Sequence, residues 1–588
     1  MVANWIVKSK KADFKHIMNT HKVSEVLARV LANRKLEKDD EIKRFLYPSI
    51  EGLYDPMALK DMEKACLILR DKILHNKKIR IVGDYDVDGI SATFILYTGL
   101  IKCGANVDYE IPDRIKDGYG INDNIIKQAF DDGVDTILTC DNGITAFDQT
   151  IMAKDMGMTL IITDHHEIAT KEIKGNKLEN IPLADAVINP KQSECTYPNK
   201  KLCGAAIAFK LIQALYKIYS FEEEIQALLE AVAIATVCDV MDLVDENRIL
   251  VKLGLENLRK SKNQGLNALM DLSDINIEKL STYHLGFIIG PCLNASGRLD
   301  TAKRGLELLL VESEEEAYKI SKELKELNDI RKDMTQKGVE EAKELIETTE
   351  LGHDKILVVY LADCHESIAG IIAGRIREYY HKPTFILTKG EKSVKGSGRS
   401  IENYNMFQEL ERSGEYLIQF GGHPMAAGLS LEEDQISSFR KSLNDLTTLT
   451  DEDLIAKVTI DVVLPLGYIG KELVGELSIL EPFGKANPKP VFAERDVRVT
   501  RAFLLGKNKN VLKLNIINKH GKRMDAMYFS DVESFLNDLR NKFGEDEVDK
   551  MFKNLENNIQ FNIIYYPNIN EYNGRSNLQI IINNYLIT

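Results

Sequence analysis

Three aspartates at alternate positions, followed by a glycine, are the first residues in this sequence whose spacing could do chemistry. They lie in "GDYDVDG", where Asp84, Asp86 and Asp88 precede Gly89. The spacing matches the first half of an EF-hand calcium loop, which also needs a glutamate at about position 12 and a helix before the loop. Counted from Asp84, that position is Ile95, and the preceding "KIRIV" is typical of a strand. The aspartates are therefore interpreted as cation-binding carboxylates at the end of a strand.

Two further strand-like segments end in the same residue types. "DTILTCDNG" carries Asp141, and "TLIITDHH" carries Asp164, His165 and His166. Taken singly, "DNG" is usually a turn and "DHH" could cap a helix. Their occurrence in order at successive strand ends favours one site, because ligands of parallel sheets bind at the carboxyl ends of the strands. Carboxylates with an imidazole suit Mn²⁺ or Mg²⁺, and two such ions can catalyse phosphoryl displacement.

The elements that must position these residues follow from the hydrophobic pattern. Strand–helix alternation from about residue 78 predicts an α/β fold with a parallel sheet covered on both faces. A charge-rich helical segment predicts a long, solvent-exposed helix that leads to a second α/β unit, and short strand-like segments after it predict a small β-barrel. The predicted domains are an N-terminal helical cap at 1–48, the catalytic domain at 49–311, the connecting helix at 312–350, the second α/β domain at 351–450 and the barrel at 451–588.

Composition limits the class of protein. The chain of 588 residues is 44% hydrophobic and 28% charged, as in soluble globular proteins of several domains. A formal net charge of −14 argues against coating of nucleic acid by bulk electrostatics, but it permits a local basic groove. The eight cysteines contain no C-x-x-C pair, which favours a reducing cytoplasm. No start resembling a signal peptide and no run long enough to span a membrane is found in the sequence.

Several motifs together resemble a known family. "GDYDVDG", "DNG", "TDHH" and "VCDV" resemble the four metal motifs of the DHH phosphoesterase superfamily, and "NASGR", "GSGRS" and "GGHPMAAG" resemble its accessory DHHA1 portion. "IPDRIKDGYG", "FLYP" and "LEPFGKANPKPVF" narrow the resemblance to the RecJ family of exonucleases. The resemblance covers nearly the whole chain, and it implies a DHH domain, a DHHA1 domain and a C-terminal OB-fold barrel.

The resemblance implies a role for each member of the acidic set. Asp86 and Asp88 would each bind one of two cations, Mn²⁺ or Mg²⁺, with Asp84 beside them as a ligand or a near neighbour. Asp141 would bridge both cations. His165 and Asp239 would be two further metal ligands. Asp164 would orient His165, and His166 would donate a hydrogen bond to the scissile phosphate.

A pocket for a terminal phosphate is implied as well. Arginine offers a planar pair of donors that matches phosphate oxygens, although a surface ion pair is its commoner fate. His423 could contact the phosphate backbone or simply fix a loop. The matching positions are Arg114, Asn294, Ser296, Arg298, Ser397, Arg399 and His423, and Gly396 and Gly398 would let backbone amides approach the anion.

The barrel resembles an OB-fold, which binds single strands with basic grooves and stacked aromatic side chains. A barrel interior also needs aromatic residues, so each tyrosine of the barrel could belong to the core or to a stacking platform. The candidate cations are Lys507, Lys509, Lys513 and Arg523, and the candidate aromatic residues are Tyr565, Tyr566 and Tyr572.

The function implied by the resemblance is removal of nucleotides from the 5′ end of single-stranded DNA in repair and recombination, by two-metal hydrolysis. Two alternatives stay open, namely a phosphodiesterase for short oligonucleotides or dinucleotides and a non-catalytic replication scaffold. The barrel argues against the first, and the complete set of aspartates and histidines argues against the second. The family implies cooperation with single-strand-binding protein and a helicase, although no segment identifies a docking site, and the chain is expected to be monomeric.

Overall fold

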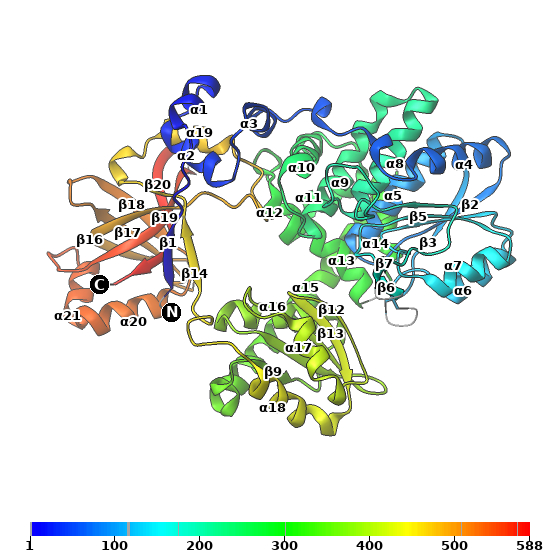
Figure 1. Cartoon of the computed structure of the whole chain (residues 1–588). Helices are drawn as coiled ribbons and strands as arrows, with labels where there is room; N and C mark the ends of the chain where they lie inside the picture. Colours follow the sequence, from blue (N-terminus) through cyan, green and yellow to red (C-terminus); the bar gives the residue numbers. More distant parts are fainter. Residues whose placement is uncertain are drawn as a thin grey trace. The chain divides into compact units, whose positions relative to one another are not determined.

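The computed structural model describes residues 3–114, 118–173, 176–299, 301–506, 508–572 and 574–587. The chain forms two compact units (Figure 1). The first comprises Met1–Ser49, Leu243–Asp245 and Ala456–Thr588, and the second comprises Ile50–Asp242 and Glu246–Ile455. Each unit contains several of the five predicted segments, so this division does not test the predicted domain boundaries, which stay predictions. No helix among the described residues is both long and apolar enough to cross a membrane.

The second unit contains the predicted parallel sheet. Its strand order is β3-β2-β4-β5-β8, and every neighbouring pair is parallel. The strands are short runs rich in aliphatic residues, such as "TILTC" and "TLIIT", as expected for strands buried on both faces. The strands are β2 (Lys78–Val82), β3 (Asn106–Glu110), β4 (Thr136–Cys140), β5 (Thr159–Thr163) and β8 (Ala186–Ile188), and the crossover helices are α5 (Val87–Lys102), α6 (Asp123–Asp131) and α7 (Phe147–Asp155).

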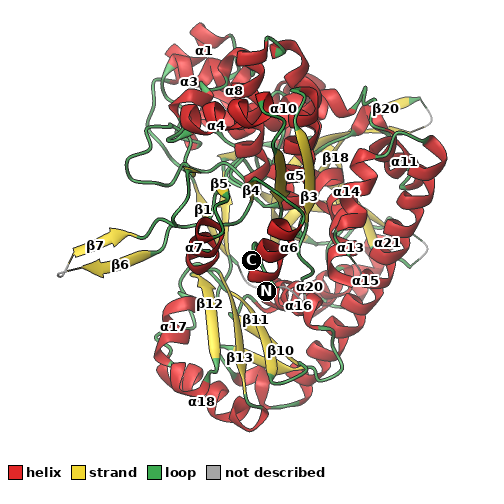
Figure 2. Cartoon of the chain, turned by 90° about the vertical axis from the view of Figure 1, so that its right-hand side faces the viewer, coloured by secondary structure: helices red, strands yellow, loops and turns green. Residues whose placement is uncertain are grey.

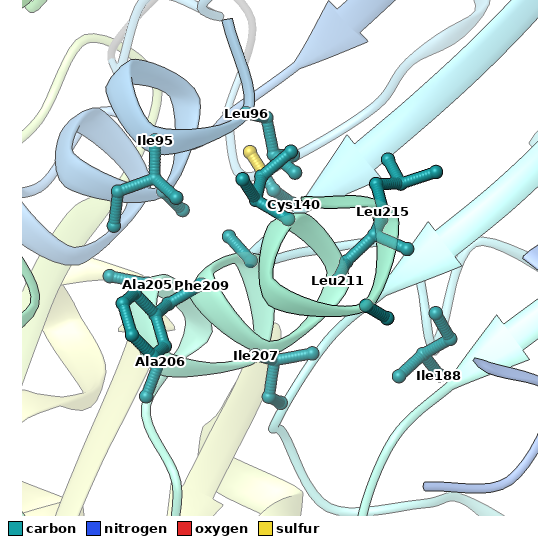
Figure 3. Close-up of a cluster of buried hydrophobic side chains, with 14 of the residues drawn as sticks. Ile95, Leu96, Cys140, Ile188, Ala205, Ala206, Ile207, Phe209, Leu211 and Leu215 are labelled. Carbon is teal, nitrogen blue, oxygen red and sulfur yellow. The ribbon is translucent and has the colours of Figure 1, made fainter. Parts of the chain in front are cut away.

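Helices cover both faces of this sheet. On one face α5 packs with α4 (Met62–Leu74) and α8 (Gly204–Tyr219), where Ile95, Cys140 and Phe209 belong to one buried cluster (Figure 3). On the other face α6 and α7 pack against Ile137 and Ile162. Because both faces are covered, the carboxyl ends of the strands are the part of the sheet that can present polar side chains. An antiparallel hairpin, β6 (Thr170–Ile173) and β7 (Asn176–Glu179), projects from this domain (Figure 2).

A run of helices follows the sheet. Cys238 ends α9, and α12, a π-helix and α13 form one uninterrupted helical stretch over residues 282–299. The elements are α9 (Leu229–Cys238), α10 (Asp245–Leu258), α11 (Gln264–Leu272), α12 (Thr282–His284), the π-helix (Leu285–Ile289), α13 (Gly290–Leu299) and α14 (Lys303–Leu310).

Helix α15 (Glu314–Thr348) connects the parallel sheet domain to a second α/β domain. At 1.5 Å per residue it is about 50 Å long. Its charge density predicts a solvent-exposed helix, but one stripe of it is buried, including Leu324 and Ala342. The stripe forms because the first half packs on α11, α13 and α14 and the second half packs on α16 (Glu366–Tyr380).

The second α/β domain has a mixed sheet of order β12-β13-β11-β10-β9. Helices α15 and α16 cover one face, and α17 (Met406–Arg412) and α18 (Ile436–Leu446) supply buried residues to the core on the other. The strands are β9 (Leu357–Tyr360), β10 (Thr384–Lys389), β11 (Val394–Arg399), β12 (Gln419–His423) and β13 (Ala426–Leu431).

The first unit contains the predicted barrel. Strand β16 pairs with both β17 and β19, which closes the order β16-β17-β18-β20-β19. The N-terminal segment is not a separate cap, because Leu27 and Phe45 share a core with the barrel and β1 pairs with β14. The elements are β1 (Asn4–Val7), α1 (Phe14–His21), α2 (Glu25–Asn33), α3 (Asp39–Leu46), β14 (Lys457–Ile460), β15 (Val462–Val463), α19 (Lys471–Ser478), β16 (Phe492–Leu505), β17 (Val511–Ile517), β18 (Arg523–Tyr528), α20 (Val532–Phe543), α21 (Glu545–Phe552), β19 (Gln560–Tyr572) and β20 (Arg575–Leu586).

A buried ion pair anchors α8 in the parallel sheet domain. Lys210 Nζ lies 2.7 Å from Glu246 Oε1, and both side chains are fully buried. The Tyr197 hydroxyl donates to the same carboxylate at 2.8 Å, and the backbone N–H of Tyr54 donates to it at 2.9 Å. Because a buried charge is costly unless it is paired and hydrogen-bonded, these contacts fix α8 against its surroundings.

We expect Glu246→Ala to destabilise the second unit by about 3–5 kcal/mol, because the ammonium of Lys210 would remain buried without its partner. The unfolding midpoint measured by calorimetry would fall accordingly. In the double variant Lys210→Met with Glu246→Leu the loss is smaller, since no charge is left behind. Asp329→Ala, which removes an exposed ion pair with Lys332 on α15, is the control with a loss below about 1 kcal/mol. Equal losses in the single and double variants would contradict this assignment.

Candidate metal centre

Acidic residues converge at the carboxyl ends of three adjacent strands. Strand β2 ends just before Asp84, β4 ends just before Asp141 and β5 ends just before Asp164. Because β2, β4 and β5 are neighbours in a parallel sheet, their carboxyl ends lie side by side. Asp239 joins them as the residue that follows the last turn of α9.

The side chains of this region form overlapping groups of ligand atoms. His165 Nε2 lies 3.1 Å from Asp141 Oδ1, 3.6 Å from Asp88 Oδ2 and 3.8 Å from Asp239 Oδ2. Such distances leave room for a cation between the atoms. Three groups have all their ligand atoms within 4.8 Å of one another: Asp84, Asp86 and Asp141; Asp88, His165 and Asp239; and Asp141, His165 and His166.

Helix N-termini fix two of the aspartates. Asp86 caps α5, where its Oδ1 accepts from the N–H groups of Asp88 and Gly89 at 2.9 and 3.1 Å. The Asp88 carboxylate accepts from the N–H groups of Gly204 and Ala205 at the start of α8, at 2.6 and 2.8 Å. The unpaired N–H groups and the dipole at a helix start stabilise a carboxylate, so both side chains are held in one orientation.

The glycine that ends the acidic motif permits a close approach. A Cβ on Gly89 would lie 2.5 Å from the carbonyl oxygen of Asp84, a distance too short for any side chain at this position. Gly89 lies in the first turn of α5, and its missing side chain lets this helix pack on the strand end.

Asp141 has a strained backbone and tight surroundings. Its φ of 61° lies in the left-handed region, which aspartate tolerates better than most residues. A Cβ on Gly204 would lie 2.6 Å from the Cβ of Asp141 and 2.8 Å from its Oδ1. The Tyr119 hydroxyl donates to the Asp141 carbonyl at 2.7 Å. Strain of this kind persists where the surrounding structure fixes a functional residue.

Asp164 contacts the ring of His166 rather than the ring of His165. Its Oδ1 lies 2.7 Å from His166 Nδ1, and it also accepts from the backbone N–H groups of His165 and His166. Asp164 was expected to orient the His165 ring, but it contacts only the backbone N–H of His165. The reason is geometric, because the His165 ring turns toward Asp88, Asp141 and Asp239.

Burial shifts the pKa values of this cluster. Burial, together with the charge of Asp86, raises the pKa of Asp84 to about 8. Burial and the neighbouring carboxylates raise the pKa of Asp141 well above its usual range, and burial raises that of Asp88 although His165 opposes it. Burial lowers the pKa of His165 to about 4, so its imidazole is neutral and can offer a lone pair.

Asp164 and His166 show the opposite behaviour. Burial opposes ionisation of both, but their mutual hydrogen bond outweighs it, lowering the pKa of Asp164 and raising that of His166 to about 9. The pair is therefore ionic, with His166 cationic near neutral pH.

The cluster fits a divalent cation. Asp84 Oδ1 and Asp141 Oδ1 are buried without a hydrogen bond. Buried carboxylates without compensation are costly, and a bound cation reverses that cost by favouring their ionised form. Oxygen donors with one imidazole match the ligands that Mn²⁺ and Mg²⁺ take in proteins.

Four arginines, which we call the arginine group, gather near this centre: Arg114, Arg298, Arg331 and Arg399. Arg114, on the loop after β3, has its guanidinium 4.9 Å from the centre of the Tyr85 ring. Arg298 on α13 donates to the carbonyl of Ser367 at 2.6 Å. Burial and repulsion from Arg114, Arg331 and Arg399 lower the pKa of Arg298 to about 10. Mutual repulsion among partly buried cations is reduced by a bound anion, so the group is suited to hold one.

Strand β11 places Arg399 and Ser397 on one face, since side chains alternate along a strand. The intervening glycines have a packing role instead of the predicted anion contact. A Cβ on Gly396 would lie 2.6 Å from Leu387, and one on Gly398 would lie 2.4 Å from the Met406 sulfur. Their backbones pair with β10 and β13, so their amides belong to the sheet.

The other expected phosphate contacts are different in the structure. The Asn294 side chain accepts from the N–H of Val87 at 3.1 Å, which ties α13 to the start of α5. Ser296 is fully buried, and its hydroxyl donates to the Leu293 carbonyl, so it serves helix packing rather than a ligand. His423 is exposed, and its Nδ1 accepts from the N–H of Met425 at 3.2 Å, which fixes the turn between β12 and β13.

The barrel candidates lie in the first unit. Lys507 is outside the described residues, whereas Lys509 and Arg523 are exposed. Lys513 Nζ lies 2.7 Å from Asp525 Oδ2, so its charge is partly balanced. Of the candidate aromatic residues, Tyr565 is fully buried and donates to the Leu464 carbonyl, which makes it a core residue.

Two residues of the site were not identified from the sequence. The Tyr119 hydroxyl lies 3.0 Å from His166 Nδ1, and Arg331 of α15 contributes to the arginine group. Tyr119 follows Arg114 in the quoted motif "IPDRIKDGYG", which was the available signal. For Arg331 there was no signal, because it lies in a charge-rich helix where most cations face solvent.

Comparison with protein families identifies three known domains. Residues 78–236 match the family described as "DHH family, N-terminal domain", residues 353–448 match "DHHA1 domain", and residues 460–584 match "RecJ OB domain".

Comparison with known proteins gives matches along the whole chain. The "Single-stranded-DNA-specific exonuclease RecJ" of Bacillus subtilis is 34% identical over 564 residues, covering 95% of this chain and 68% of the relative. The protein of the same name from Escherichia coli is 33% identical over 581 residues, covering 95% of each chain. A crystal structure of RecJ from Thermus thermophilus in complex with Mn²⁺ covers 100% of this chain and 80% of its own, with a TM-score of 0.81 and 24% identity. This likeness confirms the predicted fold class.

We expect Gly204→Ala to weaken Mn²⁺ binding at least about tenfold, because its methyl group would displace Asp141 and disturb the N–H donors to Asp88. Titration calorimetry with Mn²⁺ measures the affinity. Gly374→Ala is the matched control, since a Cβ there on α16 meets nothing within 4 Å. Unchanged Mn²⁺ affinity in a folded Gly204→Ala protein would contradict the assignment of Asp141 as a ligand.

Proposed function

The chain belongs to the RecJ family of single-stranded-DNA-specific exonucleases, and we propose that it removes nucleotides from the 5′ end of single-stranded DNA by metal-dependent hydrolysis. The observation that carries this proposal is the buried cluster of carboxylates at the strand ends, whose unpaired oxygens fit cations. The group of arginines beside it supports recognition of a strand end.

We assign the metal ligands from the overlapping groups. Asp84, Asp86 and Asp141 would hold one cation, and Asp88, His165 and Asp239 would hold the other, with Asp141 near both. Two bound cations would lower the pKa of a water molecule and stabilise charge on the attacking and leaving oxygens. The imidazole of His165 favours Mn²⁺ over Mg²⁺.

The protein's own groups position the phosphodiester. His166 is held by Asp164 through Nδ1, so Nε2 is the atom we assign as the donor to an oxygen of the scissile phosphate. The cationic state of His166 strengthens such a hydrogen bond. Asp86 and Asp88 are oriented by N–H donors at helix N-termini, which holds their carboxylates in place for a cation.

Recognition of the 5′ end is assigned to the arginine group. Arg114, Arg298 and Arg399 come from a loop, from α13 and from β11, so an anion between them would connect the two α/β domains. A terminal phosphate carries more negative charge than an internal one and suits this group better. Cooperation with single-strand-binding protein and a helicase, action as a monomer and a cytoplasmic location are further parts of the proposal, which rest on the family resemblance and cysteine usage.

We expect single strands labelled at the 5′ end to release labelled mononucleotide first, while strands labelled at the 3′ end stay long until late. Asp141→Asn is expected to lower the rate more than about a hundredfold, beyond the loss typical of residues that only orient metal ligands. Asparagine tolerates the left-handed backbone, so the fold is kept. Exonuclease gels measure polarity and rate.

Stability separates this effect from misfolding. Without metal, Asp141→Asn is expected to unfold at a higher temperature than the wild-type chain, because one buried negative charge is removed. Added Mn²⁺ would raise the midpoint of the wild-type chain more than that of the variant, which lacks the carboxylate near both cations. Asp155→Asn, an exposed residue of α7, is the control. Release from the 3′ end, equal digestion of duplex, or full activity of Asp141→Asn would overturn the proposal.

We expect Arg399→Gln to reduce the preference for a 5′-phosphorylated strand over a 5′-hydroxyl strand by about 10–100-fold, because a charge-assisted pair to phosphate is lost. The ratio of kcat/KM for the two strands measures the preference. Lys395→Gln removes an exposed cation from the same face of β11 and is the matched control. If both variants retain the wild-type ratio, Arg399 does not contact the terminal phosphate.

A further inference from the structure

An exposed aromatic pair lies outside the site described so far. The rings of Tyr283 and Phe287 stack with centroids 5.2 Å apart and an interplanar angle of 23°. Their exposed fractions are 59% and 62%, although both are large apolar side chains. Residues four apart lie on one face of a helix, so the two rings form one surface, which we call the aromatic ledge.

The aromatic ledge belongs to an element with unusual local structure. Phe287 lies within the π-helix Leu285–Ile289, which sits between α12 and α13. Single π-helical turns inside α-helices are rare and frequent at functional sites, because the widened turn redirects side chains. The turn here projects Phe287 outward while Leu285 and Ile289 are buried.

The same element packs against the metal centre. The Cys238 sulfur lies 3.5 Å from the Leu285 carbonyl oxygen, and a Cβ on Gly290 would lie 2.1 Å from that sulfur. Cys238 is the last residue of α9, and Asp239 follows it directly. The π-helix therefore adjoins the end of α9 that presents Asp239.

The contacts along the helical stretch 282–299 indicate which part of a bound strand would lie at the aromatic ledge. Arg298 stands at the arginine group, Asn294 contacts the start of α5 beside the acidic residues, and Gly290 contacts Cys238 next to Asp239. Phe287 of the π-helix and Tyr283 of α12 come next in the same direction along the helical stretch. At 1.5 Å per residue, Phe287 lies about 16 Å from Arg298 along the helix.

Cations accompany the aromatic ledge. Arg259 Nη2 donates to the Leu280 carbonyl at 2.9 Å, which places the loop "RKSK" (residues 259–262) beside the start of α12. This loop holds three cations and no acidic residue in a chain of net charge −14. Aromatic rings beside cations form the surface on which single strands stack, with sequence tolerance because every base has a π-face.

We propose that the aromatic ledge stacks bases of the single strand a few nucleotides beyond the scissile phosphate. The inference rests on the proposed function, since it takes the 5′ end to lie at Arg298. A spacing of 3.4 Å per stacked nucleotide lets about five nucleotides cover 16 Å, and fewer if the strand is extended. The bases concerned are therefore about the third to the fifth from the 5′ end.

The test compares two 5′-phosphorylated 12-nucleotide strands. One carries all its bases, and the other has abasic sites at the third to fifth nucleotides. The wild-type chain is expected to show about a tenfold higher KM for the abasic strand, because stacking on the ledge is lost. The double variant Tyr283→Ala with Phe287→Ala is expected to raise KM for the full strand about tenfold and to remove the difference between the strands.

Two further variants distinguish stacking from other causes. Phe287→Leu keeps apolar surface but has no ring, and we expect it to raise KM for the full strand and to reduce the difference between the two strands. Tyr318→Ala removes a tyrosine of α15 that is 55% exposed and is the matched control with wild-type KM. Unchanged unfolding midpoints show that each variant is folded.

Each remaining outcome decides the matter. A double variant that still distinguishes the strands as the wild-type chain does would overturn the aromatic ledge. Wild-type behaviour of Phe287→Leu would overturn it too, since apolar contact with another protein surface would then explain the pair. Failure of the wild-type chain to degrade either strand would instead overturn the proposed function, and the inference would fall with it.

Discussion

Buried negative charge at one edge of a parallel sheet is the constraint on which the rest of the second unit depends. Asp84, Asp88 and Asp141 are almost inaccessible to water, and burial raises the pKa of each. Carboxylates in such an environment destabilise a fold unless hydrogen bonds or cations compensate them. The helix N-termini and close-packed glycines around these carboxylates hold them in place despite the cost of burying them.

The compensation within the chain is partial. Two helices, α5 and α8, direct their N-termini at Asp86 and Asp88, and α8 is itself fixed by the buried Lys210–Glu246 pair. Glycines at 89 and 204 allow the backbone to come close enough for these contacts. Such hydrogen bonds orient the oxygens without neutralising them. The chain therefore arranges a site that is geometrically prepared and still short of positive charge, as a cation site must be.

Sequence reasoning could predict the parts of the fold that depend on periodic patterns. The alternation of strands and helices predicted the parallel sheet, and the adjacent strand ends bring Asp84, Asp141 and His165 together as expected. The packing of the N-terminal helices with the barrel was not predictable, because their apolar faces do not reveal their partner. The buried stripe of α15 was missed for a similar reason, since small residues such as Ala342 and Gly338 are weak signals of burial.

Motif matching also could not separate residues that face a ligand from residues that face the core. Ser296 and Arg298 belong to one motif, yet the serine is fully buried and bonded to its own helix, whereas the arginine reaches another domain. The same applies to "GSGRS", where the glycines pack into the sheet while Ser397 and Arg399 share the opposite face. The direction of a side chain depends on helix and strand geometry that spacing alone does not reveal when the register of the element is unknown.

Helix α13 joins the acidic cluster to the arginine group, and this connection would set which phosphodiester of a bound strand is cleaved. Asn294 ties α13 to the acidic loop, and Arg298, one turn later, ties it to the second α/β domain. One helical turn is about 5.4 Å, so the spacing between the two attachments is set by a rigid element rather than by a loop. A strand whose terminal phosphate is held by the arginines would then present an adjacent phosphodiester to the carboxylates and their cations. In that arrangement the length of α13 between the two attachments would limit how far from the end cleavage can occur.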